Sequence, residues 1–128
     1  MNLSTQIAQN LRALDFDISA QRNDIHELIH RYLLLIEKWN RIHNLTAIKN
    51  PADMLIQHIM DSLAVIPHIT GPHIVDVGSG AGLPGLPIAL AKPDWQVDLV
   101  ESNQKKASFL QQVRIELALD NVTVFPSR

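Results

Sequence analysis

The sequence contains no cysteine among its 128 residues, so disulfide bonds and thiolate chemistry are excluded. It also has no stretch of about 20 apolar residues, the length that a membrane-spanning helix needs. Its first residues lack the basic start and apolar run of a secretory signal. We therefore expect a cytoplasmic protein that has no membrane partner.

An excess of basic residues is missing as well. Lys and Arg number 11 against 13 Asp and Glu, and the net charge is −2. Proteins that bind nucleic acid usually carry a basic surface. Either the substrate is not a nucleic acid, or the basic residues are clustered, or they lie on further sequence.

What is present is a globular composition, 46% hydrophobic and 19% charged, in a chain long enough for one domain. Its most informative stretch is residues 73–87, HIVDVGSGAGLPGLP. A short apolar run containing Asp76 leads into a glycine-rich turn, and an apolar helical pattern follows. Glycine has no Cβ atom, so its backbone adopts positive φ easily and a ligand can lie against bare peptide. The stretch predicts a strand, a turn and a helix that hold a nucleotide-like cofactor.

Two cofactors fit this turn. Gly80, Gly82 and Gly85 satisfy the G-x-G-x-x-G pattern of dinucleotide binding, which places a pyrophosphate at the helix N-terminus. The longer pattern, Asp76-x-Gly78-x-Gly80-x-Gly82, resembles the first motif of methyltransferases that use S-adenosyl-L-methionine. That molecule has no phosphate but carries a sulfonium cation, which a nearby carboxylate would stabilise. We favour S-adenosyl-L-methionine; a dinucleotide and a purely structural turn are the alternatives.

The region before this turn predicts helices only. Apolar residues repeat at helical spacing over residues 4–14, where Ser4 is the expected N-cap, and over residues 19–42, where Ser19 is. A third helix begins at Asn50-Pro51, an N-cap followed by proline in the first helical position, and stops before the next proline. These patterns predict three amphipathic helices.

Three polar residues, His58, Asp61 and Ser62, share one face of the third predicted helix because they are three and four residues apart. One histidine and one carboxylate make a poor metal site, and a single helix face cannot align a Ser-His-Asp triad with an oxyanion hole. We interpret the three as a polar patch that hydrogen-bonds a neighbouring loop. A direct role at the edge of the cofactor or substrate pocket is the alternative.

Strand and helix patterns alternate after the glycine-rich turn. Residues 95–100 and 122–125 predict strands, and residues 104–119 predict a helix between them. This order is typical of a Rossmann-like α/β fold, with a parallel sheet, right-handed crossovers and helices on both faces. We expect a helical extension over residues 1–70 and the first half of this domain over residues 71–128.

Glu101 stands at the end of the second predicted strand, where an acid in dinucleotide folds accepts hydrogen bonds from ribose hydroxyls. The same carboxylate could instead interact with the dipole of the helix that follows. We favour ribose binding, because both the strand end and the separation from the glycines match.

Four blocks along the chain together resemble the RsmG family, also called GidB. They are Lys38-Trp39-Asn40, Asn44-Leu45-Thr46, residues 58–62 (HIMDS) and residues 76–85 (DVGSGAGLPG). Members are bacterial enzymes that methylate guanine N7 in 16S ribosomal RNA of the small subunit. The resemblance covers nearly the whole chain and includes Ser127-Arg128. Family members continue for several more strands, so we expect this chain to be truncated after its third strand.

The resemblance implies S-adenosyl-L-methionine as cofactor and small-subunit ribosomal RNA, free or within the assembled subunit, as partner of a monomer. It implies that the cofactor is bound by Asp76, Gly78, Ser79, Gly80, Gly82, Leu83 and Glu101. Guanine N7 has a free lone pair at neutral pH, so no general base is assigned. Arg128 is a candidate contact for RNA phosphate or the guanine edge. The alternatives are a truncated or inactive relative that binds cofactor or RNA without turnover, and a small-molecule methyltransferase.

Overall fold

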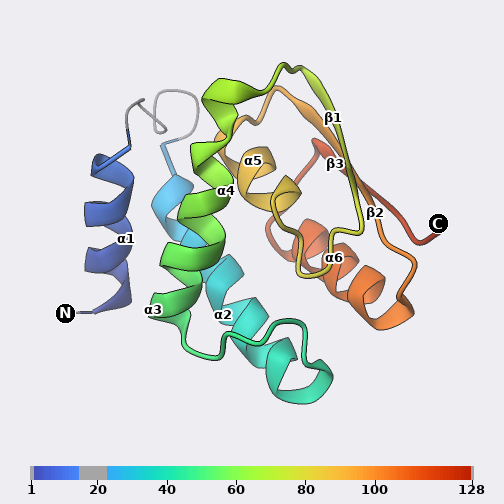
Figure 1. The fold of residues 1–128 in the computed structure, drawn as a ribbon, viewed down its shortest axis with the longest axis horizontal. Coiled ribbons are helices and arrows are strands. Elements are labelled where there is room, and N and C mark those ends of the chain that lie inside the picture. The colour runs from blue at the N-terminus through green and yellow to red at the C-terminus, as the bar shows by residue number, and fades with distance from the viewer. Residues whose placement is uncertain (1, 15–22, 128) are drawn as a thin grey trace.

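The computed structural model of the chain describes residues 2–14 and 23–127. A group of helices packs on one side of a three-stranded sheet (Figure 1). In chain order the elements are α1 (Leu3–Arg12), α2 (Ile25–His43), α3 (Pro51–Met54), the π-helix η2 (Leu55–Met60), α4 (Asp61–Ala64), the 3-10 helix η3 (Ile66–His68), β1 (His73–Val77), α5 (Gly85–Ala91), β2 (Gln96–Val100), α6 (Gln104–Glu116) and β3 (Val122–Phe125).

The first two helices differ from the sequence prediction at their starts. The N-cap of α1 is Asn2, whose side chain accepts a hydrogen bond from the Thr5 amide at 2.8 Å, so the expectation for Ser4 is wrong. Ser4 lies inside the first turn instead. The expected cap Ser19 lies outside the described residues, and α2 begins at Ile25 after a turn. Both helices bury the apolar stripe that the periodicity predicts.

The third predicted helix is confirmed and contains a feature that periodicity did not reveal. The Asn50 side chain accepts a hydrogen bond from the Ala52 amide at 2.8 Å, and Pro51 occupies the first helical position. The helix then widens into η2 before it continues as α4. A π-helix has hydrogen bonds between residues i and i+5 and is therefore wider than an α-helix. Such segments are rare in proteins as a whole, but many of them occur at functional sites.

The sheet is parallel with strand order β1-β2-β3, which confirms the predicted α/β fold class. Two right-handed crossovers in one direction put α5 and α6 on the same face of the sheet, as Figure 1 shows. The predicted cover of both faces is therefore not seen among the described residues. The side chains that face these helices are buried, among them Val97, Leu99 and Val124. On the opposite face Val75 and Val77 are exposed.

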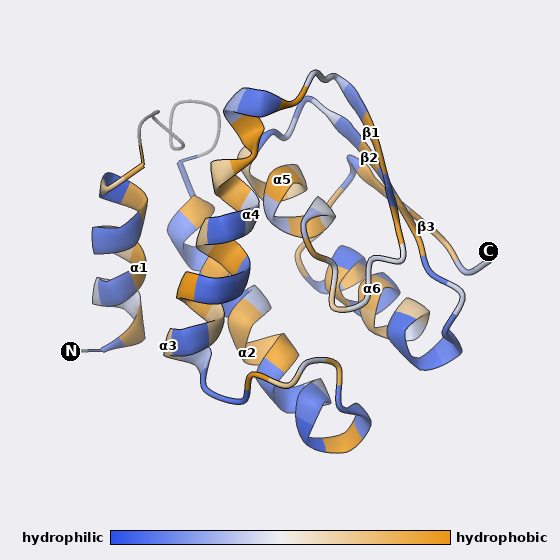
Figure 2. Cartoon of the chain, in the orientation of Figure 1, coloured by the Kyte–Doolittle hydropathy of each residue, from blue (hydrophilic) through white to orange (hydrophobic). Residues whose placement is uncertain are grey.

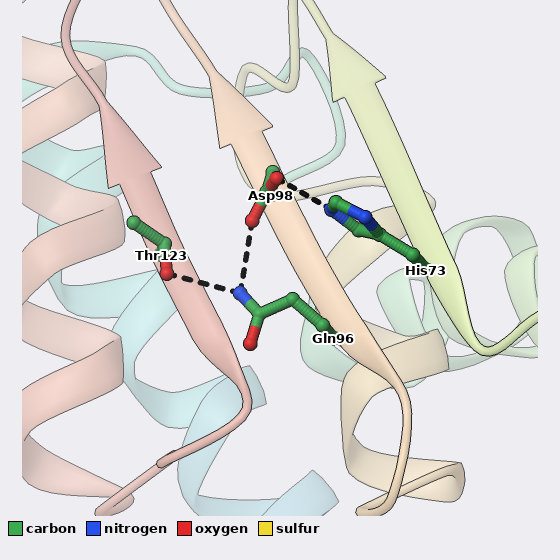
Figure 3. Close-up of polar contacts among 4 residues, drawn as sticks. All are labelled: His73, Gln96, Asp98 and Thr123. Carbon is green, nitrogen blue, oxygen red and sulfur yellow. Dashed lines mark hydrogen bonds and ion pairs between the residues drawn. The ribbon is translucent and has the colours of Figure 1, made fainter.

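A polar ladder crosses the exposed face at the amino edge of the sheet (Figure 3). His73 Nε2 lies 2.7 Å from Asp98 Oδ2, and Gln96 Nε2 donates to Asp98 Oδ1 at 2.9 Å and to Thr123 Oγ1 at 3.0 Å. These contacts join the starts of all three strands. The ladder is therefore a cross-strand stabilising device at the edge opposite the glycine-rich turn.

One hydrophobic core unites the helical region with the α/β region. Tyr32 of α2 and Phe109 of α6 are the largest fully buried side chains. Hydrophobic segments run along the strands, whereas the start of α6 is hydrophilic (Figure 2). No helix in the described ranges is long and apolar enough to cross a membrane. The division of the chain near residue 70 stays a prediction.

Candidate functional site

The predicted site residues meet at the carboxyl edge of the parallel sheet. Asp76 lies near the end of β1, the turn of residues 78–84 follows, and Glu101 comes directly after β2. In α/β sheets ligands bind at this edge, outside the carboxyl ends of the strands. The yellow-green turn between β1 and α5 in Figure 1 marks the place.

The glycines of the turn divide into two kinds. Gly78, Gly80 and Gly82 all have positive φ, at +75°, +58° and +99°. A Cβ atom built on Gly78 or Gly80 would meet nothing within 4 Å, whereas one built on Gly82 would collide with Leu86. The first two glycines therefore border open space, and Gly82 packs against the interior.

Hydrogen bonds fix the path of the turn. The Gly78 amide donates to the Val100 carbonyl at 2.8 Å, which ties the turn to β2. The Gly82 and Leu83 amides both donate to the Ser79 carbonyl, at 2.8 and 3.0 Å. The Ser79 hydroxyl donates to the Asp76 carbonyl at 3.0 Å and is buried. The Ser79 side chain thus holds the turn together from inside.

Tyr32 connects the helical region to this turn and was not predicted as a site residue. It is fully buried, and its hydroxyl donates to the Ala81 carbonyl at 2.6 Å. Burial, with a smaller contribution from the charge of Asp76, raises the pKa of the Tyr32 hydroxyl, so the group remains a neutral donor. The sequence placed Tyr32 on the buried stripe of α2, and a buried tyrosine hydroxyl normally needs a partner.

Replacing Tyr32 by phenylalanine is expected to lower the free energy of unfolding by about 1–3 kcal/mol, because the Ala81 carbonyl loses its partner in a buried place. Urea unfolding of the two proteins measures this change. The same variant should bind cofactor more weakly, since the turn becomes less ordered. Unchanged stability together with unchanged affinity would show that the hydroxyl contributes nothing to the turn.

Asp76 lies on the face of β1 that points toward α5. Its Oδ2 accepts a hydrogen bond from the Gly85 amide at 3.0 Å, so the carboxylate caps the start of α5. Desolvation raises the pKa of Asp76 above its ordinary value of 3.8, although bonds from Gly85 and Ser79 oppose the shift. The charge of Glu101 raises it further. The ionised carboxylate therefore destabilises the folded protein, and a nearby cation would reduce this destabilisation.

The raised pKa predicts a pH dependence of stability with a definite sign. Between 3.8 and the folded-state pKa the folded chain binds more protons than the unfolded chain, so stability decreases as pH rises through this window. Asp76→Asn keeps the acceptor for Gly85 and removes the charge. Urea unfolding from about pH 3 to about pH 7 should show wild type losing stability relative to this variant. If the free energies of unfolding of the two proteins changed in parallel with pH, desolvation of Asp76 would not destabilise the folded protein.

Glu101 closes the other side of the turn. Its side chain is only 7% exposed. Oε1 accepts from the Gly80 amide at 2.7 Å, and Oε2 accepts from the Asn103 amide at 2.9 Å, at the start of α6. The contact with Asn103 fits the alternative prediction, in which the carboxylate interacts with the start of the following helix. Ribose binding by Glu101 stays a prediction. Each carboxylate oxygen retains a lone pair for a hydroxyl donor.

The polar patch on the third helix also contacts a loop. His58 Nε2 lies 2.8 Å from Thr46 Oγ1, which confirms for His58 the predicted hydrogen bond to a neighbouring segment. The buried Ser62 hydroxyl donates to the carbonyl of His58 one turn earlier, at 2.6 Å. Burial lowers the pKa of His58, although hydrogen bonding at the Gln57 backbone and the charge of Asp61 act in the opposite direction.

The site therefore holds a bare backbone cradle with a carboxylate on each side. The backbone at Gly78 and Gly80 borders open space, and the Glu101 carboxylate beside it can accept hydrogen bonds, which is compatible with a nucleoside-like group. Arg128, the candidate RNA contact, lies outside the described residues. The sequence analysis did not predict the contacts that Tyr32 makes with the turn and that Thr46 makes with His58. The buried position of Tyr32 and the loop position of Thr46 were only weak indications of these contacts.

Comparison with known proteins gives one family. The family model described as GidB, rRNA small subunit methyltransferase G, matches residues 25–128. A protein named Ribosomal RNA small subunit methyltransferase G from Nitrosomonas eutropha is 56% identical over 128 residues, all of this chain and 59% of that protein. Its namesake from Nitrosospira multiformis is 58% identical over 128 residues, and here too all of this chain is covered, with 58% of the relative.

A more distant relative of the same name, from Pseudomonas syringae pv. syringae, is 45% identical over 123 residues, which cover 96% of this chain and 56% of the relative. The chain thus spans a little under three fifths of the length of these curated relatives. The matched residues include α2, the polar patch, the glycine turn and Glu101. The chain belongs to the GidB family of rRNA small subunit methyltransferase G proteins.

Proposed function

We propose that this chain carries the cofactor cradle of an rRNA (guanine-N7)-methyltransferase that uses S-adenosyl-L-methionine and acts on small-subunit ribosomal RNA. The observation that carries the proposal is the open backbone at Gly78 and Gly80, held in positive φ beside the buried carboxylate of Glu101. The name shared by the relatives supports the substrate class. We propose the cytoplasm as its location, because the proposed substrate is ribosomal RNA.

The charges around the turn favour a sulfonium over a pyrophosphate. A dinucleotide needs its pyrophosphate at the start of the helix after the glycines. Here the amide of Gly85 at that position is already engaged by the Asp76 carboxylate. An added phosphate would lie beside one partly buried carboxylate and near a second at Glu101, and like charges at such sites repel. A cation gains from both carboxylates.

The chain's own residues would divide the work as follows. Bound S-adenosyl-L-methionine supplies an electrophilic methyl group on a positively charged sulfur. Gly78 and Gly80, with Leu83 at the end of the turn, present main chain to it; Glu101 accepts hydrogen bonds from ribose hydroxyls; Asp76 offers negative charge toward the methionine portion. This arrangement removes water and fixes orientation, which can contribute up to ~7–11 kcal/mol.

No general base is required of this chain. The N7 atom of guanine carries a lone pair that is free at neutral pH, so attack needs no prior proton transfer. The target guanine must be unpaired or turned out of its stack to be reached. Lys105 and Lys106 stand in the first turn of α6, at the same edge as the cradle. We assign them to RNA phosphate, where two local cations would offset the net charge of −2.

Two measurements test the proposal. Calorimetry should show S-adenosyl-L-methionine binding to the protein and not NADH, and Gly78→Ala should weaken binding by at least about tenfold, because a Cβ atom fills the ligand side while the αL cost stays near 1–2 kcal/mol. The full-length protein should transfer labelled methyl to undermethylated small subunits rather than to small molecules. NADH binding in preference, or transfer to small molecules alone, would replace the proposal.

A further inference from the structure

A small hollow lies directly beside the glycine turn, on the side of the helical region. The third helix contributes Gln57, His58, Asp61 and Val65 to its wall, and the end of the turn contributes Leu83 and Pro84. Its volume is about 270 Å³. Pockets for drug-sized ligands run from ~300 to 1,000 Å³, so this hollow suits a single flat group the size of one base.

The hollow begins where the cofactor cradle ends. Leu83 follows Gly82 in the chain, and the hydrogen bond that its amide donates to the Ser79 carbonyl, at 3.0 Å, fixes it to the turn. Leu83 therefore belongs both to the proposed cradle and to the wall of the hollow. In Figure 1, α4 lies beside α5 and the turn. A ligand in this hollow would adjoin the proposed cofactor rather than occupy a remote surface.

The helical wall is held in place and has an unusual backbone. Gln57 and His58 belong to the π-helix η2. This type of helix is rare overall but occurs often at functional sites. The imidazole of His58 is fixed by Thr46 Oγ1, and Ser62 ties the backbone of His58 to the next turn. Asp61 is exposed at the rim. The hollow thus combines an apolar wall with a carboxylate, a carboxamide and an imidazole.

These groups match one nucleobase better than the others. The Watson–Crick edge of guanine presents two adjacent donors, N1–H and the N2 amino group, which one carboxylate accepts in a bidentate manner. Adenine and cytosine each present a donor beside an acceptor on that edge, and uracil presents one donor between two acceptors. Val65, Leu83 and Pro84 offer apolar surface for the face of the ring. A carboxylate at this rim would therefore favour guanine over the other bases.

We propose that the hollow between η2–α4 and Leu83-Pro84 is the acceptor site for an unpaired guanine, whose Watson–Crick edge is read by Asp61. This inference rests on the proposed function for its placement beside the cofactor. In guanine the N7 atom lies on the side of the ring system opposite the N1 and N2 edge. A base held by Asp61 therefore keeps N7 free of hydrogen bonds and available as a nucleophile. Asp61 acts as a specificity residue that contacts the substrate.

The experiment compares nucleotides that differ by one amino group. Saturation-transfer NMR with guanosine, inosine and adenosine monophosphates is recorded on the full-length protein in the presence of S-adenosylhomocysteine. Inosine keeps N7 and N1–H but lacks the N2 amino group. We expect guanosine monophosphate to bind wild type at least about tenfold more tightly than inosine monophosphate, the range of one hydrogen bond to a charged group. Asp61→Asn should abolish this preference and leave S-adenosylhomocysteine affinity unchanged.

Asp53→Asn is the matched control, because Asp53 is an exposed carboxylate on the same helical stretch and does not line the hollow. It should retain the guanosine preference. A preference that survives Asp61→Asn, an absent preference in wild type, or a loss of S-adenosylhomocysteine affinity in Asp61→Asn would each overturn the acceptor site. The last result would assign Asp61 to the cofactor instead.

The outcomes separate this inference from the proposed function. Guanosine preference that depends on Asp61, in a protein that fails to methylate small subunits, would keep the base site and reject the proposed reaction. Methylation of small subunits without such a preference would keep the reaction and reject the base site. The rate at which the Asp61→Asn variant methylates small subunits tests the base site directly. This rate should fall at least about tenfold relative to wild type if the base site is correct.

Discussion

Replacing Gly82 by alanine is expected to lower the free energy of unfolding by roughly 3 kcal/mol or more. The residue has φ +99°, a conformation that side chains disfavour. A Cβ atom there would lie 2.8 Å from Leu86 Cγ and 2.9 Å from the Tyr32 hydroxyl oxygen, in a buried place. Relief of these contacts requires the buried side chains of Leu86 and Tyr32, or the turn itself, to shift. Urea unfolding monitored by circular dichroism measures the loss.

Gly80→Ala is the matched control for this prediction. Gly80 also has positive φ, at +58°, but a Cβ atom there meets nothing within 4 Å. The expected cost is therefore the conformational one alone, about 1–2 kcal/mol. Equal losses in the two variants would mean that backbone conformation, and not packing against Leu86 and Tyr32, dictates glycine at position 82.

Substituting Glu101 by alanine is expected to weaken binding of S-adenosyl-L-methionine by roughly tenfold to a hundredfold. Hydrogen bonds to a charged group are worth about 1.5–3 kcal/mol, and the ribose hydroxyls would lose theirs. The variant should also be less stable, since the Gly80 and Asn103 amides lose the acceptor that each has at under 3 Å. Calorimetric titration of both proteins gives the affinity ratio.

Asp120→Asn controls for the loss of one negative charge. Asp120 is an exposed carboxylate in the turn before β3, at the amino edge of the sheet and hence opposite the cradle. It should leave cofactor affinity unchanged. If Glu101→Ala binds as well as wild type while remaining folded, Glu101 serves only to join the glycine turn to the start of α6, and the ribose assignment is withdrawn.

The α/β half of the fold was largely predictable from local patterns. Residues 122–125 form β3 as predicted, and Asn103, the N-cap of α6, accepts a hydrogen bond from the Lys106 amide at 3.1 Å. Periodicity and capping are local properties, and each acts within a few residues. The end of α6 was predicted less well. The helix stops at Glu116 rather than at Leu119, and Ala118 adopts a positive φ of +53°.

The partners of the site side chains were not predictable in the same way. Tyr32 and Ala81 are 49 residues apart in the sequence, and Gly80 and Glu101 are 21 apart. Such contacts depend on how helices and strands pack, and spacing along one element carries no information about them. The sequence indicated that Tyr32 is buried and left the acceptor of its hydroxyl open.

By itself the sequence determined a glycine-rich turn after a short strand in a parallel α/β fold, with one acid before the glycines and another after the next strand. It did so because positive φ and helix capping are imposed by single residue types. Only the tertiary structure decided which glycines face open space and which are packed, and which helix borders the turn. Those outcomes follow from close packing between elements distant in sequence, where one methyl group of volume changes what fits.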